Sequence, residues 1–300
     1  MGGARRRGGR RGGSGRAGRG RPGCAATGGR LDGPRPAGST AGPTGGDDVR
    51  RRELERHLTQ WLAVADFDDD ALNGLQVEGR SEVRRVALAV SACAEVFALA
   101  AEEGADAVIV HHGLFWKRHG VEPVKGPLRK RLGLLLSHEI SLFAYHLPLD
   151  AHQEFGNNAV AARALGLRNL EPFGDYHGRK IGWKGVLARA QSRASFVARL
   201  EAFYGHRALV VPGGPEAIVS AAVVSGGAAD LATQAARERL DCFVTGEAAE
   251  HVTYLCREQR VNFAALGHYA TERVGVRALA ERLRDELRLE TFFLEVENEA

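Results

Sequence analysis

The chain has 300 residues, of which 44% are hydrophobic and 26% are charged. This composition supplies a full hydrophobic core for one large or two smaller domains, so a short or disulfide-stapled fold is excluded. No run reaches the ~18 apolar residues that a membrane span needs, and no secretory signal is evident, so we expect a cytoplasmic protein without a membrane partner.

The charge of the chain is unevenly divided. Residues 1–46 hold ten arginines and one acid, Asp32, for a net charge of +9, whereas the other 254 residues carry a net charge of −5. A head so rich in Arg and Gly cannot bury enough apolar surface to fold, and we expect it to be disordered. Two interpretations stay open: a tail that binds nucleic acid through phosphate charge, or an artefact of too early a translation start.

We expect ordered structure to begin at Asp47 and Asp48, which can cap a helix. That helix has apolar residues on one face at i, i+4, i+7 and i+8, namely Leu54, Leu58, Trp61 and Leu62.

Further along, apolar runs that predict strands alternate with patterns that predict helices. The expected strands cover 84–90, 106–110, 140–146, 207–211, 217–225, 241–245, 261–266 and 291–295. The expected helices cover 94–103, 127–138, 157–166, 195–204, 228–239, 247–259 and 271–288. This alternation implies βαβ crossovers and largely buried sheets, and the predicted fold class is therefore α/β.

A glycine-containing stretch at 167–190 is expected to be irregular and to separate two lobes. Lobe one then covers about 47–170 plus 262–300, and lobe two covers about 171–261. No glycine-rich phosphate-binding motif follows a strand, so neither a Rossmann nor a P-loop nucleotide site is expected. In an α/β fold, the ligand site is expected in the cleft at the carboxyl ends of the strands.

Side chains that can bind metal follow three of the predicted strands: His111 and His112, then His146 and Asp150, then His268 and Glu272. Each group has an ordinary alternative. The tandem histidines can form a hydrogen-bonded turn, Asp150 can cap a helix, and the last pair can be a surface pair at i, i+4. Their shared position after strands favours a metal site.

Imidazole and carboxylate ligands suit zinc, iron, manganese or nickel better than copper(I). Without His146, the side chains that follow the strands offer five metal ligands. One catalytic zinc takes three protein ligands, so we expect two metal ions that share a carboxylate. Two divalent ions partly offset by two carboxylates leave a charge of about +2, which favours an anionic substrate. The cysteines show no CxxC pair, and we expect free thiols rather than a zinc knuckle.

Five ordered motifs carry a family resemblance: LNGLQVEG (72–79), DAVIVHHGLFWK (106–117), AYHLPLDAHQEFGNNA (144–159), VTGEAAEH (244–251) and NFAALGHYATERVGVRALAERL (262–283). They resemble the Nif-three-like family, labelled GTP cyclohydrolase I type 2 homologs, over nearly all of 49–300. The resemblance implies a two-lobed α/β subunit of the short form, a toroidal homohexamer and a dinuclear metal centre. The implied metal ligands are His111, His112, Asp150, His268 and Glu272, with Glu272 as the bridge.

Three nearby residues are candidates for catalysis. His146 can orient a ligand or shuttle a proton, or it can merely hydrogen-bond to the backbone. Glu247 and His251 can take part in proton transfer, although an acid at a helix start is favourable for the helix dipole alone. Among the neighbours, stacking on a base or simple packing is expected of Phe115 and Trp116, and bracing of the loops is expected of Asn73 and Gln76.

Two functions stay open. The first is a metal-dependent hydrolase that acts on a nucleotide or related anionic heterocycle, as the family label implies. The second is a non-catalytic, metal-binding ring that handles metal or serves as a scaffold for DNA or protein.

Overall fold

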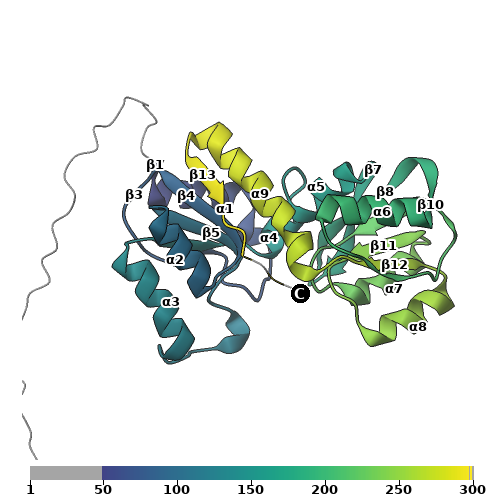
Figure 1. The fold of residues 1–300 in the computed structure, drawn as a ribbon, viewed down its shortest axis with the longest axis horizontal. Coiled ribbons are helices and arrows are strands. Elements are labelled where there is room, and N and C mark those ends of the chain that lie inside the picture. The colour runs from purple at the N-terminus through teal and green to yellow at the C-terminus, as the bar shows by residue number, and fades with distance from the viewer. Residues whose placement is uncertain (1–48, 297, 299–300) are drawn as a thin grey trace, which may run out of the picture. The chain divides into compact units, whose positions relative to one another are not determined.

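The computed structural model describes residues 49–296 and 298, and these residues fall in one compact unit. The Arg-rich head and the expected capping residues Asp47 and Asp48 lie outside them. Two large sheets with helices packed on both faces make up the described part, which confirms the predicted α/β class (Figure 1).

The first sheet has the strand order β13-β4-β5-β6-β2. Its first four strands run parallel, and β2 pairs antiparallel with β6. The strands are β2 (Gly74–Val77), β4 (Arg85–Ser91), β5 (Ala107–His112), β6 (Ser141–Ala144) and β13 (Glu290–Phe293). A separate antiparallel pair joins β1 (Val49–Arg50) to β3 (Glu82–Val83).

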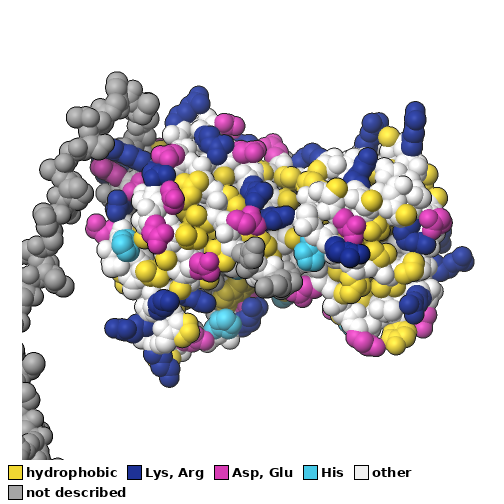
Figure 2. Space-filling view, viewed as in Figure 1, with side chains coloured by type: hydrophobic (Ala, Val, Ile, Leu, Met, Phe, Trp, Pro, Cys, Tyr) yellow, Lys and Arg dark blue, Asp and Glu magenta, His cyan; other side chains and the backbone are white. Residues whose placement is uncertain are grey.

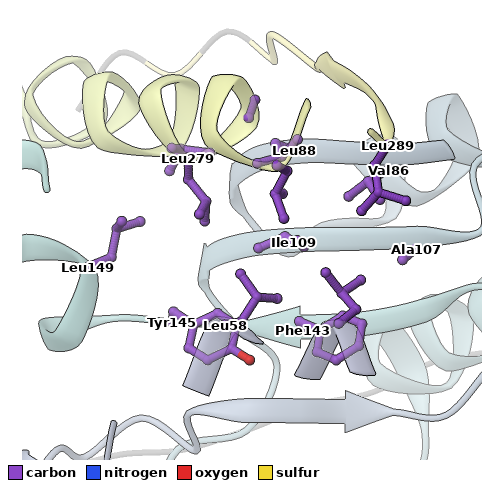
Figure 3. Close-up of a cluster of buried hydrophobic side chains, with 14 of the residues drawn as sticks. Leu58, Val86, Leu88, Ala107, Ile109, Phe143, Tyr145, Leu149, Leu279 and Leu289 are labelled. Carbon is purple, nitrogen blue, oxygen red and sulfur yellow. The ribbon is translucent and has the colours of Figure 1, made fainter. Parts of the chain in front are cut away.

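Helices cover both faces of the first sheet because successive strand residues point to opposite sides and both sets are apolar. α1 (Arg51–Trp61) and α9 (His268–Leu287) pack on one face. α2 (Ala94–Glu102) and α3 (Gly126–Ser137) pack on the other. In Figure 3, Leu88, Ile109 and Phe143 from three adjacent strands lie with Leu279 of α9 in the first of these cores.

The predicted apolar face of the first helix is confirmed. Leu54, Leu58 and Leu62 are buried, and Trp61 packs against the same core while partly exposed. The helix itself begins at Arg51, and the extended residue Arg50 occupies the N-cap position without a side-chain cap.

The second sheet has the order β7-β8-β10-β11-β12-β9, with β10, β11 and β12 parallel and the other pairs antiparallel. Its strands are β7 (Leu167–Tyr176), β8 (Arg179–Ser192), β9 (Leu209–Val211), β10 (Ala217–Val223), β11 (Cys242–Thr245) and β12 (Asn262–Ala265). α5 (Asn157–Ala164) and α6 (Arg193–Tyr204) pack on one face. α7 (Ala232–Arg237) and α8 (Glu250–Gln259) pack on the other.

The expectation of an irregular stretch at 167–190 was wrong, because β7 and most of β8 form a long hairpin there. Its turn is at His177 and Gly178, both with positive φ. The glycines that suggested a loop instead permit close strand packing. A Cβ on Gly182 would lie 2.5 Å from the carbonyl oxygen of Val223, and one on Gly185 would lie 2.7 Å from that of Arg168.

The two sheets give a structural basis for two lobes, which we keep as a proposal. β7 begins at Leu167 and β12 at Asn262, so the second sheet extends a few residues beyond 171–261 at each end. Between β6 and β7 the chain forms the short helix α4 (Leu147–Ala151) and then α5. Three 3-10 turns complete the elements: η1 (Val64–Asp66), η2 (Lys117–His119) and η3 (Ala229–Leu231).

Among residues 49–296 and 298, no helix combines the length and the apolar character that a membrane crossing requires. On the face seen in Figure 2, basic and acidic side chains are interspersed over both sheets.

Candidate metal centre

Three histidines converge at the carboxyl ends of β5 and β6. These strands are parallel neighbours, so the residues at their ends meet at one edge of the first sheet. His111 and His112 are the last two residues of β5, and His146 follows β6. The ring centroids lie 4.7 Å apart for His111 and His112, and 5.0 Å apart for His111 and His146.

Glu272 lies among these imidazoles. Its Oε2 is 3.1 Å from Nε2 of His112, and its Oε1 is 3.5 Å from Nε2 of His111. His268, the first residue of α9, brings its Nε2 to 3.1 Å from Oε1. The spacing i, i+4 places His268 and Glu272 on one face of α9, and the Glu272 side chain is only 4% exposed.

Asp150 completes the group from inside α4, where Oδ2 lies 3.4 Å from Nε2 of His111. It does not cap a helix through its carboxylate, because its Oδ1 accepts hydrogen bonds from Asn157 and Ser225 instead. The structure thus brings together all five predicted ligands, with ligand atoms of each triad within 4.8 Å of one another: His111 with Asp150 and Glu272, and His112 with His268 and Glu272. A third triad joins His111, His112 and His146.

Each of the four histidines is held through Nδ1, which turns Nε2 toward the cluster. His111 donates to the carbonyl oxygen of Tyr145 at 3.0 Å, and His112 lies 3.0 Å from Oγ of Ser91. The remaining two contact carboxylates: His146 donates to Asp69 at 2.9 Å and His268 to Glu247 at 2.6 Å. A histidine whose Nδ1 carries the proton offers Nε2 as a ligand, which is the arrangement that metal sites use.

The donor atoms of the cluster fit a metal ion. Nε2 of His111, Nε2 of His268 and Oε2 of Glu272 are buried and have no hydrogen-bond partner among the described residues. Burying such atoms without partners is costly, and a cation in their midst satisfies them together. Imidazole nitrogen and carboxylate oxygen are ligands that suit divalent zinc, iron, manganese and nickel.

Burial and neighbouring charges shift the pKa values of the cluster in opposite directions. Burial lowers the pKa of His111, but the carboxylates of Asp150 and Glu272 outweigh it and raise that pKa to about 9. Burial and the neighbouring imidazoles lower the pKa of His112 to about 3 despite the attraction of Glu272. Glu272 has its pKa held well below the usual range, because the surrounding histidines overcome the effect of burial.

Glu247 and His251 occupy different surroundings. Glu247 contacts His268 directly, so it can orient that ring. His251 lies outside the cluster, 60% exposed, and its Nε2 is 2.7 Å from Oδ1 of Asp230. The predicted bracing by Asn73 and Gln76 is confirmed, since they accept hydrogen bonds from the backbone N–H groups of His146 and Leu114.

Sequence reasoning missed several residues that shape the centre. Asp69, from an acidic run without informative spacing, binds His146 and accepts a hydrogen bond from the N–H of Leu147 at the start of α4. Gly226 has φ +66°, and a Cβ there would clash with Oε1 of Glu272. Gly226 therefore permits the close approach of the second sheet to the cluster.

A cavity of about 660 Å³ opens onto the centre. Trp116 lines it, with its ring 5.1 Å from that of His146, whereas Phe115 packs against the core. Arg118 also lines the cavity and stacks 4.6 Å over Trp116, while its Nη1 lies 2.8 Å from Oδ2 of Asp70. The cavity is thus lined by an aromatic ring beside His146 and by a guanidinium that is paired with Asp70.

The chain is similar in sequence to known proteins. The family model Duf34/NIF3 (NGG1p interacting factor 3) matches residues 49–300. A GTP cyclohydrolase 1 type 2 homolog from Deinococcus radiodurans is 41% identical over 256 residues, covering 85% of this chain and 97% of its own. The homolog of the same name from Escherichia coli K12 is 40% identical over 257 residues, covering 84% of this chain and 100% of its own.

Solved structures share the fold of the chain. The protein ybgI, described as of unknown function, superposes with a TM-score of 0.79 at 39% identity, covering 84% of this chain and all of that one. TTHA1606 from Thermus thermophilus gives a TM-score of 0.77 at 39% identity with the same coverage. The chain therefore belongs to the Duf34/NIF3 family.

Proposed function

We propose that this protein holds two divalent metal ions per subunit and acts as a metal-dependent hydrolase on a nucleotide or related anionic heterocycle. The observation that carries the proposal is the carboxylate of Glu272, buried with each oxygen facing the Nε2 of a different imidazole. A carboxylate with two available oxygens can bind a different metal ion through each oxygen. Glu272 would bridge them, and His111, His112, Asp150 and His268 would supply the remaining protein ligands.

Divalent ions supply Lewis acidity that polarises a substrate bond and activates water near neutral pH. The protein's own groups serve binding and proton transfer. His146 is held by Asp69 with its Nε2 toward the cluster, so it can give or take a proton there. Glu247 orients His268, and His251 contacts Asp230, which lines the cavity.

The cavity supports an anionic, planar substrate. Trp116 offers an aromatic ring next to the histidines, and Arg118, which stacks over that ring and pairs with Asp70, offers further N–H donors. This combination is the one expected for a heterocycle that carries phosphate. The resemblance further leads us to propose a homohexamer, which light scattering of the purified protein tests.

The decisive measurement is metal content by mass spectrometry of the purified full chain. We expect about two ions per chain, by the shared-carboxylate arrangement, and loss of metal in His111→Ala and Glu272→Ala. His138→Ala, which removes an exposed histidine at the end of α3 that belongs to none of the metal-binding groups, is the matched control and should keep its metal. Full metal content in both cluster variants would refute the site.

Activity is tested separately by chromatography of GTP and other nucleotides incubated with protein reconstituted with Zn, Fe, Mn or Ni. Trp116→Ala should raise KM more than it lowers kcat, because Trp116 is assigned to binding. Absence of turnover with all four metals, alongside a working control enzyme, would reject the hydrolase and leave a metal-binding protein.

A further inference from the structure

The two oxygens of Asp150 have different surroundings. Oδ1 accepts two hydrogen bonds, from Nδ2 of Asn157 and from Oγ of Ser225, each at 2.8 Å. Oδ2 accepts no hydrogen bond among the described residues and faces Nε2 of His111 at 3.4 Å. The carboxylate is almost fully buried, with 7% of the side chain exposed, so bulk water does not even out this difference.

This asymmetry decides which oxygen is available to a ligand. An ionised carboxylate oxygen offers about two lone-pair sites, and both sites of Oδ1 are taken by the two donors. A cation that bound Oδ1 would have to displace a buried hydrogen bond and leave its donor unsatisfied. Oδ2 keeps its lone pairs free and already points at the imidazole of His111.

The two donors cannot easily turn away. Asn157 is fully buried, and its Oδ1 accepts a hydrogen bond of 2.7 Å from the N–H of Gly275 in α9. The N–H of Ser225 donates to Oδ1 of Asn158 at 2.7 Å. Asn158 in turn donates to the carbonyl oxygen of Ile181 in β8. Each donor is thus fixed by a further hydrogen bond to a different element.

Glu272 provides the contrast within the same centre. Both of its oxygens face imidazole nitrogens, and no amide or hydroxyl among the described residues donates to either one. The centre therefore holds one carboxylate with two available oxygens and one with a single available oxygen. The difference arises because Asn157 and Ser225 donate hydrogen bonds to Asp150.

We propose that Asn157 and Ser225 are positioning residues that restrict Asp150 to one oxygen toward a bound divalent ion, while Glu272 keeps both. This role rests on the proposed metal centre. Ser225 lies two residues after β10 of the second sheet, whereas Asp150 lies in α4, which follows β6 of the first. The second sheet thereby sets how a ligand carried by the first sheet presents itself.

The test compares two hydrogen bonds from a serine hydroxyl to an aspartate, one from Ser225 near the end of β10 and one from Ser220 within β10. Ser225→Ala removes the bond to Asp150, and the control Ser220→Ala removes the 3.1 Å bond from Ser220 to Asp241, away from the centre. Ser225→Thr restores the hydroxyl and should restore binding.

The measurements are the Zn²⁺ affinity of the full chain by chelator competition and the number of oxygen neighbours of zinc by X-ray absorption. Ser225→Ala should bind zinc 10- to 100-fold more weakly, the usual effect of losing a partner of a metal ligand, with an added oxygen neighbour. Circular dichroism and thermal unfolding of each variant check that it is folded.

Zinc affinity in Ser225→Ala equal to that in Ser220→Ala would overturn the positioning role and leave the proposed metal centre intact. Failure of the wild-type chain to bind zinc or any other divalent ion would instead overturn the centre, and the positioning role with it.

Discussion

Replacing Gly275 by alanine tests the close packing of α9 against α5 beside the centre. Gly275 lies within α9, one turn after Glu272, and its N–H donates to Oδ1 of Asn157. A Cβ at this position would lie 2.5 Å from the backbone nitrogen of Asn157 and 2.6 Å from its Oδ1. Ordinary contacts between carbon atoms are about 3.5–4.0 Å, so α5 or α9 must shift.

The expected magnitude follows from opposing contributions. Overpacking of this kind costs about 1–3 kcal/mol, and weakening the hydrogen bond to Asn157 costs about 1 kcal/mol more. Alanine favours the helix over glycine by about 1 kcal/mol. We therefore expect Gly275→Ala to lower the free energy of unfolding by about 1–3 kcal/mol.

Gly133→Ala is the matched control. Gly133 lies within α3, and a Cβ there would meet nothing within 4 Å. With no clash to offset the helix preference, this variant should gain about 1 kcal/mol. The assay is urea unfolding of the metal-free proteins at pH 7, followed by circular dichroism. A Gly275→Ala protein as stable as Gly133→Ala would refute the inferred packing of α5 against α9.

Three further predictions concern the stability of the fold: the contribution of a core residue, the loss of stability at acid pH and the effect of bound zinc. Leu279→Ala should lower the free energy of unfolding by about 2–5 kcal/mol in urea unfolding, because Leu279 is fully buried between α9 and the first sheet (Figure 3). Burial raises the pKa of Asp69, but hydrogen bonds from His146, Asn73 and the Ala71 N–H and the charge of His146 lower it to about 2. This depressed pKa contributes about 2 kcal/mol to the free energy of unfolding, which is fully present above about pH 4 and lost as the pH falls through about 2. The wild type should therefore lose its stability advantage over Asp69→Asn between pH 5 and pH 2. An advantage that stays constant over this range would contradict the assignment. Zn²⁺ at 100 times its Kd should stabilise the wild type by about 2.7 kcal/mol in thermal unfolding, with little effect on Glu272→Ala.

Much of the fold was predictable because its signals are local. Apolar runs marked β5 and β6 well, and the positions of His111 and His112 at a strand end or of Glu272 one turn after His268 are visible in the sequence. Parallel strands bring their carboxyl ends together, so these side chains could be expected to meet. The hairpin of β7 and β8 was missed because its glycines serve strand packing, which cannot be distinguished from loop flexibility in one sequence.

The residues that orient the ligands could not be predicted in the same way. Asp69 is 77 positions from His146, and Ser225 is 75 positions from Asp150. Neither pair has a characteristic spacing, and serine or aspartate at such places is common in turns. Their roles exist only once the two sheets are folded against each other.

The late position of α9 and β13 in the chain has a consequence for biosynthesis. The ribosome makes β4, β5 and β6 long before it makes α9, which covers their apolar face, and β13, which pairs with β4. A nascent chain that lacks both α9 and β13 therefore exposes Val86 and Leu88 and an unpaired strand edge, both of which promote aggregation. Premature termination that removes α9 and β13 would thus also leave the apolar face and one edge of the first sheet exposed.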